Sequence, residues 1–303
     1  MQIDRLFIAG VVLAIRLSVS AAVIPANGAE RVELMPNGDF EHWTEKEIKE
    51  SLLIGGKTKT LYQIGSPWGS SNAHARAFGV DKVSVSVMPE KRGGGYCCRM
   101  ENTLEVVSAV GIDFKALAIG SVYTGKLKDI VGLRQSSDPS SAIDMGVEFR
   151  GHPTALILDY KALIQDKAAV YAAATTSVKK VSGHDAGHVT LILQHRWEKD
   201  GHVYAYRVGT AVHQLSHTAD WQNDFRIPVL YGQAGKALKK LSADCYKTHN
   251  RDGKMVYIEE VGFSENVTPT HIIIQIAAGS MPPFTGCPGN VVWCDNIRLE
   301  YDE

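Results

Sequence analysis

Short runs of alternating hydrophobic and polar residues, separated by Gly, Pro, Asn and Asp, fill most of this chain. Such alternation is typical of β-strands that bury one face. The clearest hairpin is predicted where 188–198 alternates, Asp200-Gly201 turns the chain and 203–208 continues. The β-branched run 270–278 predicts a central strand that is buried on both faces. Together these runs predict an all-β protein.

The last strand that the pattern predicts holds a carboxylate among its inward-facing positions. The residues that share this parity are Trp293, Asp295, Ile297, Leu299 and Tyr301. An inward carboxylate needs a partner, and the turn-rich opening segment 34–43 is dense in oxygen ligands. If the two ends of the chain pair, the fold is a closed β-sandwich.

Helical signals are sparse. In segment 44–53, Thr44 is a candidate N-cap and Glu47 occupies the capping-box position, which predicts one short helix. The expected fold class is therefore all-β, a β-sandwich with one or two short helices.

The first 29 residues have the features of a signal peptide. A short charged lead, 1–5, precedes the apolar run 6–15, and small residues follow at positions suited to cleavage. An uncleaved membrane anchor is the alternative, but Arg16 interrupts the apolar run well short of the roughly 20 residues that spanning requires. We therefore expect an exported protein with no membrane span after cleavage, and a single domain over 30–303.

Composition and charge narrow the classes of partner. The 303 residues are 45% hydrophobic and 21% charged, which is ordinary for a globular core. Because 32 Lys and Arg balance 33 Asp and Glu, the chain has no basic footprint for nucleic acid. Five cysteines cannot all pair within one chain. Cys287 and Cys294 flank a Pro-Gly turn, so they form either a local disulfide or, as we favour, two buried thiols.

A series of short motifs, in order along the chain, carries a resemblance to a known family. They are Asn37-Gly38-Asp39-Phe40-Glu41-x-Trp43, Pro67-Trp68-x-x-x-Asn72, Tyr123-Thr124-Gly125, Gly146-x-Glu148-Phe149-x-x-x-Pro153, Tyr160-Lys161, and Gly279-Ser280 through Asp295-Asn296-x-x-Leu299. This order resembles the putative carbohydrate metabolism domain family, exported proteins found chiefly in glycan-degrading gut bacteria. The chain departs from the family pattern at Ala162 and at Met281. The resemblance implies a jelly-roll sandwich akin to galactose-binding-like modules, with a polysaccharide or oligosaccharide as partner.

Residues that can stack on sugar rings or hydrogen-bond to hydroxyl groups are the candidate ligand contacts. They are Trp68, Asn72, Glu148, Arg150, Tyr160, Lys161, Trp197 and Tyr204. About half of this set is expected to serve the core or surface instead. For Trp68 we favour an inward position that caps the core over a ligand platform. Trp197 shares parity with Leu191 and Leu193, which favours a core position for it too.

A structural calcium ion is a further implication of the resemblance, because related jelly-roll modules use one to tie the opening segment to the last strand. Glu41 and Asp295 are the candidate side-chain ligands, since calcium takes six to eight oxygens. The alternative is that Asp295 hydrogen-bonds to turn amides.

Catalysis would require two carboxylates across a cleft, about 5 Å apart in a retaining glycoside hydrolase and wider in an inverting one. Glu148, Asp159, Glu259 and Glu260 lie on or near predicted strands, and Glu148 and Glu260 are the candidates we would test. Glu259 and Glu260 alternate faces, so only one can point inward. Three functions stay open: an exported glycan-binding protein, which we favour, a glycoside hydrolase, and a structural or adhesive surface protein.

Overall fold

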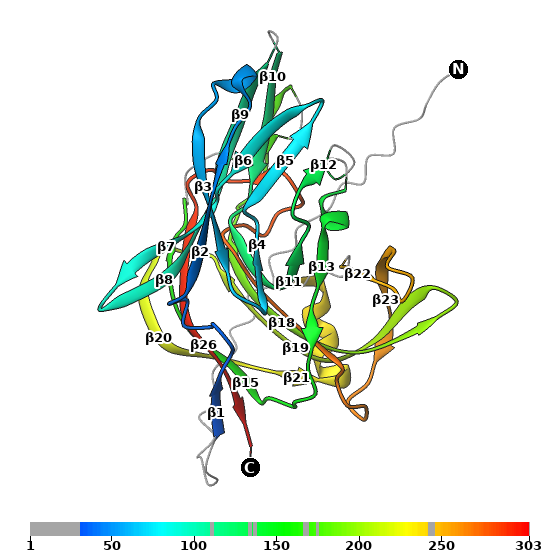
Figure 1. Ribbon diagram of the computed structural model, residues 1–303. Helices are drawn as coiled ribbons and strands as arrows, with labels where there is room; N and C mark the ends of the chain where they lie inside the picture. The colour runs from blue at the N-terminus through cyan, green and yellow to red at the C-terminus, as the bar shows by residue number, and fades with distance from the viewer. Residues whose placement is uncertain are drawn as a thin grey trace.

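The computed structural model describes residues 31–302 except 110–111, 133–134, 136–137, 166–169, 174–175 and 242–245. Almost all of the regular structure is β-strand, and the predicted all-β sandwich is confirmed (Figure 1). The predicted signal peptide lies outside the described residues. Within them, no helix is long and apolar enough to cross a membrane.

Two large sheets form the sandwich. In the first sheet the strand order is β20-β15-β26-β8-β7, and β1 also pairs with β26. In the second sheet the order is β13-β11-β24-β18-β19-β23-β22, with β14 on β24, β21 on β19 and β4 on β11. The strands of the first sheet are β1 (Arg31–Leu34), β7 (Val87–Arg92), β8 (Gly95–Glu101), β15 (Ala155–Leu163), β20 (Ala219–Pro228) and β26 (Val291–Tyr301). The strands of the second sheet are β4 (Trp68–Ser70), β11 (Ser121–Leu127), β13 (Ile143–Met145), β14 (Val147–Glu148), β18 (Gly187–Lys199), β19 (His202–Leu215), β21 (Leu230–Tyr231), β22 (Lys247–His249), β23 (Met255–Phe263) and β24 (His271–Ala277).

Smaller strand ribbons and 3-10 helices surround the sandwich. The ribbons are β2 (Trp43–Lys49) with β3 (Thr58–Ile64), β5 (Ala73–Ala77) with β6 (Val80–Ser84) and β12 (Val131–Gly132), β9 (Thr103–Ala109) with β10 (Ile112–Ala118), and β16 (Val170–Ala173) with β17 (Val178–Val181) and β25 (Thr285–Gly286). The 3-10 helices are η1 (Leu52–Ile54), η2 (Pro139–Ala142) and η3 (Gly232–Leu241).

The β-branched strand β24 is central and buried on both faces, as its sequence predicts. Ile272, Ile274 and Ile276 belong to the main core between the two sheets. Ile273 points the other way, into a second apolar cluster that also contains Ile192. The isoleucines of β24 therefore fill a core on each side of the sheet.

The opening and closing segments of the described chain meet, as predicted. Arg31 is the register partner of Tyr301, and β1 runs along the end of β26 in Figure 1. The amide of Ile297 donates to the Gly38 carbonyl oxygen at 2.9 Å. Phe40 and Ile297 are both fully buried in the main core. The first and last strands therefore close one sandwich.

The predicted parity of the closing strand is wrong for its first half. Ile297 and Leu299 do face the main core, but upstream the core-facing residues are Val292 and Cys294. A register shift against β15 and the positive φ of 51° at Asn296 mark a β-bulge there. Because one extra residue reverses the alternation, Trp293 and Asp295 lie on the outer face of the first sheet.

The predicted helix over 44–53 is also wrong. Residues 43–49 form β2, which pairs antiparallel with β3 over its whole length. Helix propensity is a weak preference that tertiary pairing overrides. Here the pairing buries Ile48 against Leu61 and Val83 in a small apolar cluster. Only the short turn η1 follows.

Buried thiols, the state that we favoured for Cys287 and Cys294, are what the structure shows. Both cysteines are free, and neither side chain is more than 1% exposed. Burial raises the pKa of both thiols, which keeps them protonated and unreactive.

Candidate functional site

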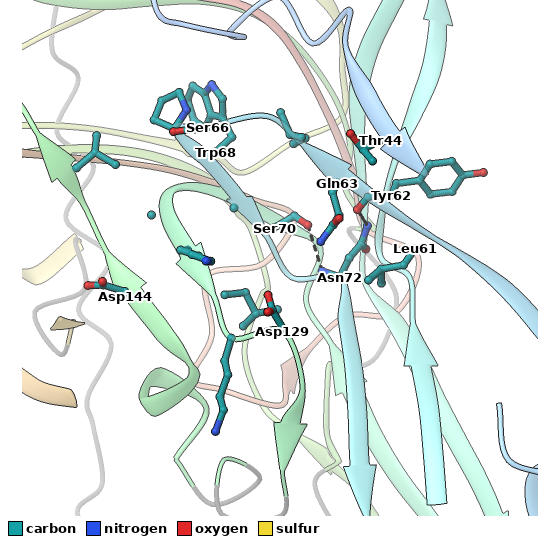
Figure 2. Close-up of a pocket in the computed structure, with 18 of the residues that line it drawn as sticks. Thr44, Leu61, Tyr62, Gln63, Ser66, Trp68, Ser70, Asn72, Asp129 and Asp144 are labelled. Atoms are coloured by element: carbon teal, nitrogen blue, oxygen red, sulfur yellow. Dashed lines mark hydrogen bonds between the residues drawn. The ribbon is translucent and has the colours of Figure 1, made fainter. Parts of the chain in front are cut away.

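A cleft of about 570 Å³ opens between β3 and the β4–β11–β13 edge of the second sheet. Figure 2 shows Asp144 and Asp129 on one side of it and Thr44 and Gln63 on the other. Lys126 also lines this cleft. The cleft therefore offers hydroxyl, amide, carboxylate and ammonium groups at one place.

Asp144 is the most firmly held carboxylate in the cleft. It accepts hydrogen bonds from Thr248 Oγ1 at 2.7 Å and from the His249 backbone amide at 3.3 Å. Its second oxygen lies 3.0 Å from Nδ1 of His249. Burial opposes ionisation of Asp144, but these hydrogen bonds outweigh burial and lower its pKa. Asp144 is therefore an ionised hydrogen-bond acceptor at neutral pH.

Trp68 and Asn72 line the cleft, but both side chains serve the fold. Trp68 is 4% exposed, lies in the main core and donates to the Pro36 carbonyl, so the expected inward position is confirmed. The amide of Asn72 donates to two backbone carbonyls and accepts from two backbone amides. With those bonds made, Asn72 has no capacity left for a ligand.

Three further candidate contacts are dispersed. Tyr160 is 7% exposed and packs edge-to-face on Phe225 in the main core, so it is a structural residue. Lys161 lies on the outer face of the first sheet, where its Nζ is 5.4 Å from the centroid of the Trp293 ring. Arg150 is exposed just after β14. The structure therefore does not gather these residues with the cleft.

Glu148 and Glu260 cannot act as a catalytic pair. Glu148 is exposed on β14 and lines a neighbouring cleft of about 350 Å³. Glu260 is buried on β23, and its oxygens contact Arg207 at 2.7 and 2.9 Å. The strand order β14-β24-β18-β19-β23 separates them by four strand spacings, about 19 Å along the sheet. Glycoside hydrolases need their two carboxylates within about 10 Å.

An aromatic face lies on the β18–β19 hairpin, and we use this name for Trp197, Tyr204 and Tyr206. The Trp197 ring stacks on Tyr204 at 5.9 Å and contacts Tyr206 at 5.0 Å between centroids. The favoured core position for Trp197 is wrong, because its side chain is half-buried. Trp197 does share parity with Leu193, which faces the main core. The prediction fails because the closed end of the hairpin extends past the first sheet in Figure 1.

The aromatic face is edged by polar groups. His195 lies beside Trp197, with 6.3 Å between ring centroids, and His202 stacks on Tyr204 at 6.1 Å. Nδ1 of His202 is 2.9 Å from a carboxylate oxygen of the exposed Glu259. Tyr206 is not among the candidate contacts chosen from the sequence, although its spacing of two residues from Tyr204 on one strand places both rings on the same face.

The two predicted calcium ligands have other partners. Glu41 accepts hydrogen bonds from the Tyr96 backbone amide at 3.1 and 3.2 Å. Asp295 faces Arg92, whose Nη1 is 2.5 Å from its Oδ2. No group of three or more His, Cys, Asp or Glu side chains suited to a metal occurs in the described part of the chain. These contacts do not fit a calcium ion shared by Glu41 and Asp295.

Asp295 instead belongs to an acidic pair on the outer face of the first sheet. Arg92 Nη1 also donates to Oδ2 of Asp159 at 2.9 Å, so the two carboxylate oxygens are no farther apart than these two distances combined. Burial raises the pKa of Asp295 above the usual range. Burial also opposes ionisation of Asp159, but hydrogen bonds from Asn296, the Asp224 amide and Arg92 outweigh it and lower its pKa.

No sequence signal pointed to Arg92, because 67 and 203 residues separate it from Asp159 and Asp295. Its guanidinium also lies over the Trp221 ring, 4.0 Å from the centroid. Only the folded first sheet brings Arg92 and Trp221 together with the acidic pair.

Two solved structures share the fold of this chain. One is described as a putative glycoside hydrolase from Bacteroides vulgatus, with 16% identity, a TM-score of 0.50, and coverage of 88% of this chain and 96% of that one. The other, described as a putative glycoside hydrolase from Bacteroides thetaiotaomicron, has 17% identity, a TM-score of 0.50, and coverage of 84% of this chain and 72% of that one. At such low identity the likeness concerns the fold alone.

The sequence matches none of the curated proteins with which it was compared. A sequence model of the putative carbohydrate metabolism domain does match, over residues 39–299. This match covers most of the chain, from just before β2 to Leu299 in β26, and includes the cleft and the aromatic face. The chain therefore belongs to the putative carbohydrate metabolism domain family.

Proposed function

We propose that this protein is an exported glycan-binding protein and that sugar rings stack on the aromatic face of the β18–β19 hairpin. The observation that carries the proposal is the row formed by Trp197, Tyr204 and Tyr206 on the solvent side of one hairpin. The membership in a carbohydrate family supports a saccharide as the ligand.

The chemistry of the aromatic face suits a sugar chain. Pyranose rings present apolar C–H faces that pack on aromatic rings, while their hydroxyl groups need hydrogen-bond partners at the edge. Tyr206 is 37% exposed, and the rings of Trp197 and Tyr204 are half-buried, so each is held in place and still offers a surface. His202 and Glu259 supply polar atoms beside the rings.

The test is binding of Trp197→Ala and Tyr204→Ala to a panel of neutral polysaccharides and their oligosaccharides, measured by affinity electrophoresis and calorimetry. Each change should weaken binding about two- to twelvefold, since a stacked aromatic contact contributes roughly 0.5 to 1.5 kcal/mol. Tyr96→Ala is the matched control, because Tyr96 has similar exposure (40%) but lies on β8 of the first sheet. Unchanged binding by both aromatic-face variants would refute the proposal.

Hydrolysis is the second candidate function, and the acidic pair favours it. Asp159 and Asp295 have a carboxylate separation compatible with the roughly 5 Å of retaining enzymes. Their pKa values shift in opposite directions, as expected for a nucleophile and a proton donor. Release of reducing sugar that disappears in Asp159→Asn and Asp295→Asn would establish this function. If polysaccharides that bind to the protein release no reducing sugar, hydrolysis is refuted and glycan binding is the function that stands.

A further inference from the structure

Arg196 carries a buried charge that the described residues do not pair. The residue is 9% exposed, and its Nε donates to Oε1 of Gln194 at 2.8 Å. Its Nη1 and Nη2 are buried and have no hydrogen-bond partner among the described residues. Removing a guanidinium from water without pairing it is costly. The fold therefore holds a buried cation whose two terminal nitrogens have no hydrogen-bond partner among the described residues.

The guanidinium of Arg196 reaches the wall of the cleft from behind. A Cβ atom on Gly146 would lie only 2.5 Å from Nη2 of Arg196, and Gly146 adopts a φ of 88° that favours glycine. Gly146 also lines the cleft. Gly146 therefore lies both at the cleft and against the charged group.

The carboxylates nearest Arg196 are engaged elsewhere. Burial lowers the pKa of Arg196 to about 10, against the opposing influence of Asp144 and Glu260. Asp144 is hydrogen-bonded to His249 and Thr248, as described above. Glu260 is paired with Arg207. Both carboxylates attract Arg196, but neither forms a hydrogen bond to it.

Two lysines add to this charge on the open side of the cleft. Lys126 and Lys128 are exposed, line the cleft, and form no ion pair with a described residue. Against these two lysines and Arg196 stand two lining carboxylates, those of Asp129 and Asp144. A cleft with low-dielectric walls concentrates such a field on whatever enters it.

We propose that the cleft binds an acidic saccharide, whose carboxylate or sulfate group contacts Lys126 and Lys128 and is stabilised by the charge of Arg196. This inference rests on the proposed function and names the substrate class, and it places the charged sugar at a surface different from the aromatic face. Carboxylated and sulfated saccharides both fit this proposal, because both carry an anionic group.

Paired polymers test the proposal. Polygalacturonate is compared with its methyl ester, and dextran sulfate with dextran, so that each pair differs in charge and the two pairs separate carboxylate from sulfate. The wild type should bind at least one charged member about tenfold more tightly than its neutral partner, and added salt should weaken this preference. Equal affinity within both pairs would overturn the proposal.

The lysines are tested by the double variant Lys126→Ala/Lys128→Ala. It should bind the preferred acidic polymer about fivefold more weakly, the expected combined effect of two exposed charge contacts. Its binding to neutral polysaccharide should not change. The control is Lys91→Ala, which removes an exposed lysine of β7 outside the cleft. A loss equal to that of the control would overturn the proposal.

Arg196→Met separates a binding role from a structural one. Nη1 and Nη2 of Arg196 make no hydrogen bond, so replacement by Met removes an unpaired charge and loses only the bond from Nε to Gln194; the melting temperature should therefore change little. The same variant should bind the acidic polymer more weakly, and Arg196→Lys should restore part of the affinity. A large fall in melting temperature with unchanged binding would show that Arg196 is structural.

The outcomes also separate this inference from the proposed function. Neutral polysaccharide that binds through Trp197, with no preference for acidic polymers, would refute only the acidic cleft. Acidic polymers that bind independently of Trp197, together with neutral polysaccharide whose binding is unchanged in Trp197→Ala or absent, would support the cleft and refute the aromatic face. Failure of all polymers to bind would refute both.

Discussion

Replacement of Arg92 by Met should destabilise the protein in a way that depends on pH. Arg92 Nη1 neutralises both Asp159 and Asp295, whose side chains are only 8% and 9% exposed. Truncating one partner of a buried ion pair costs about 3 to 5 kcal/mol, because it leaves an uncompensated charge. Asp159 keeps hydrogen bonds from Asn296 and the Asp224 amide and an ion pair with Arg298 at 3.3 Å, so a loss no greater than the lower end of this range, about 3 kcal/mol, is expected at pH 7.

The pH dependence follows from the two carboxyl groups. The lowered pKa of Asp159 means that its ionised form stabilises the fold, a contribution present above the unfolded pKa of about 3.9 and lost as pH falls through the folded value. The raised pKa of Asp295 has the opposite sign, since its ionisation costs stability at neutral pH and this cost disappears on protonation. Without Arg92 the ionised forms of both carboxyl groups are less stable in the folded protein. The destabilisation caused by Arg92→Met should therefore become smaller as pH falls below about 4 and the carboxyl groups are protonated.

Urea unfolding of wild type and Arg92→Met at pH 7 and near pH 4 measures this effect. A loss of about 3 kcal/mol corresponds to a fall of roughly 6 to 12 °C in melting temperature for a domain of this size. Asp295→Asn in the Arg92→Met background is the decisive control, because a neutral isostere needs no cation and should recover part of the loss. Destabilisation below about 0.5 kcal/mol at pH 7, or equal at both pH values, would refute the reasoning.

Three further outcomes are expected. Ile274→Ala removes a fully buried core side chain and should lower the free energy of unfolding by about 2 to 5 kcal/mol in urea titrations. Gly146→Ala should destabilise by at least about 1 kcal/mol, because the new methyl group meets Arg196 at 2.5 Å and the φ is positive; a thermal melt equal to wild type would contradict this. Burial and the nearby Arg196 lower the pKa of His271 to about 4, so protonation costs stability as pH falls below about 6.5, and His271→Asn should lose less stability than wild type between pH 7 and pH 4.5. A titration of the His271 ring by NMR with an ordinary midpoint would refute that last expectation.

Local sequence signals predicted much of the fold. The run of isoleucines identified β24 as central because only a strand with a core on each side can bury three successive apolar side chains, Ile272 to Ile274. The Asp200-Gly201 turn identified the β18–β19 hairpin, in which both residues adopt positive φ. The parity of β26 failed because a single residue, Asn296, inserts a bulge that no alternation pattern reveals.

The candidate site was harder to predict because strand order decides it. Trp197 and Tyr204 could be placed together from the sequence, since one hairpin pairs them directly. Glu148 and Glu260 both lie on strands, as expected, but three other strands separate theirs. Asp159 and Asp295 became neighbours only through the pairing of β15 with β26. Contacts of this kind depend on long-range topology, which spacing along the chain does not encode.

The pairing of Arg31 with Tyr301 opens a route to protein engineering. Opposed residues of an antiparallel pair lie about 5 Å apart, so in a variant that begins at Arg31 a short glycine-rich linker could join the C-terminus to Arg31 without disturbing either sheet. New ends could be opened in the tight turn at Phe78 and Gly79, where the phenyl ring is 83% exposed and no neighbouring atom lies within 4 Å of the position of a glycine Cβ. A circular permutant of this kind would carry fusion partners on the β5–β6 ribbon rather than beside β26.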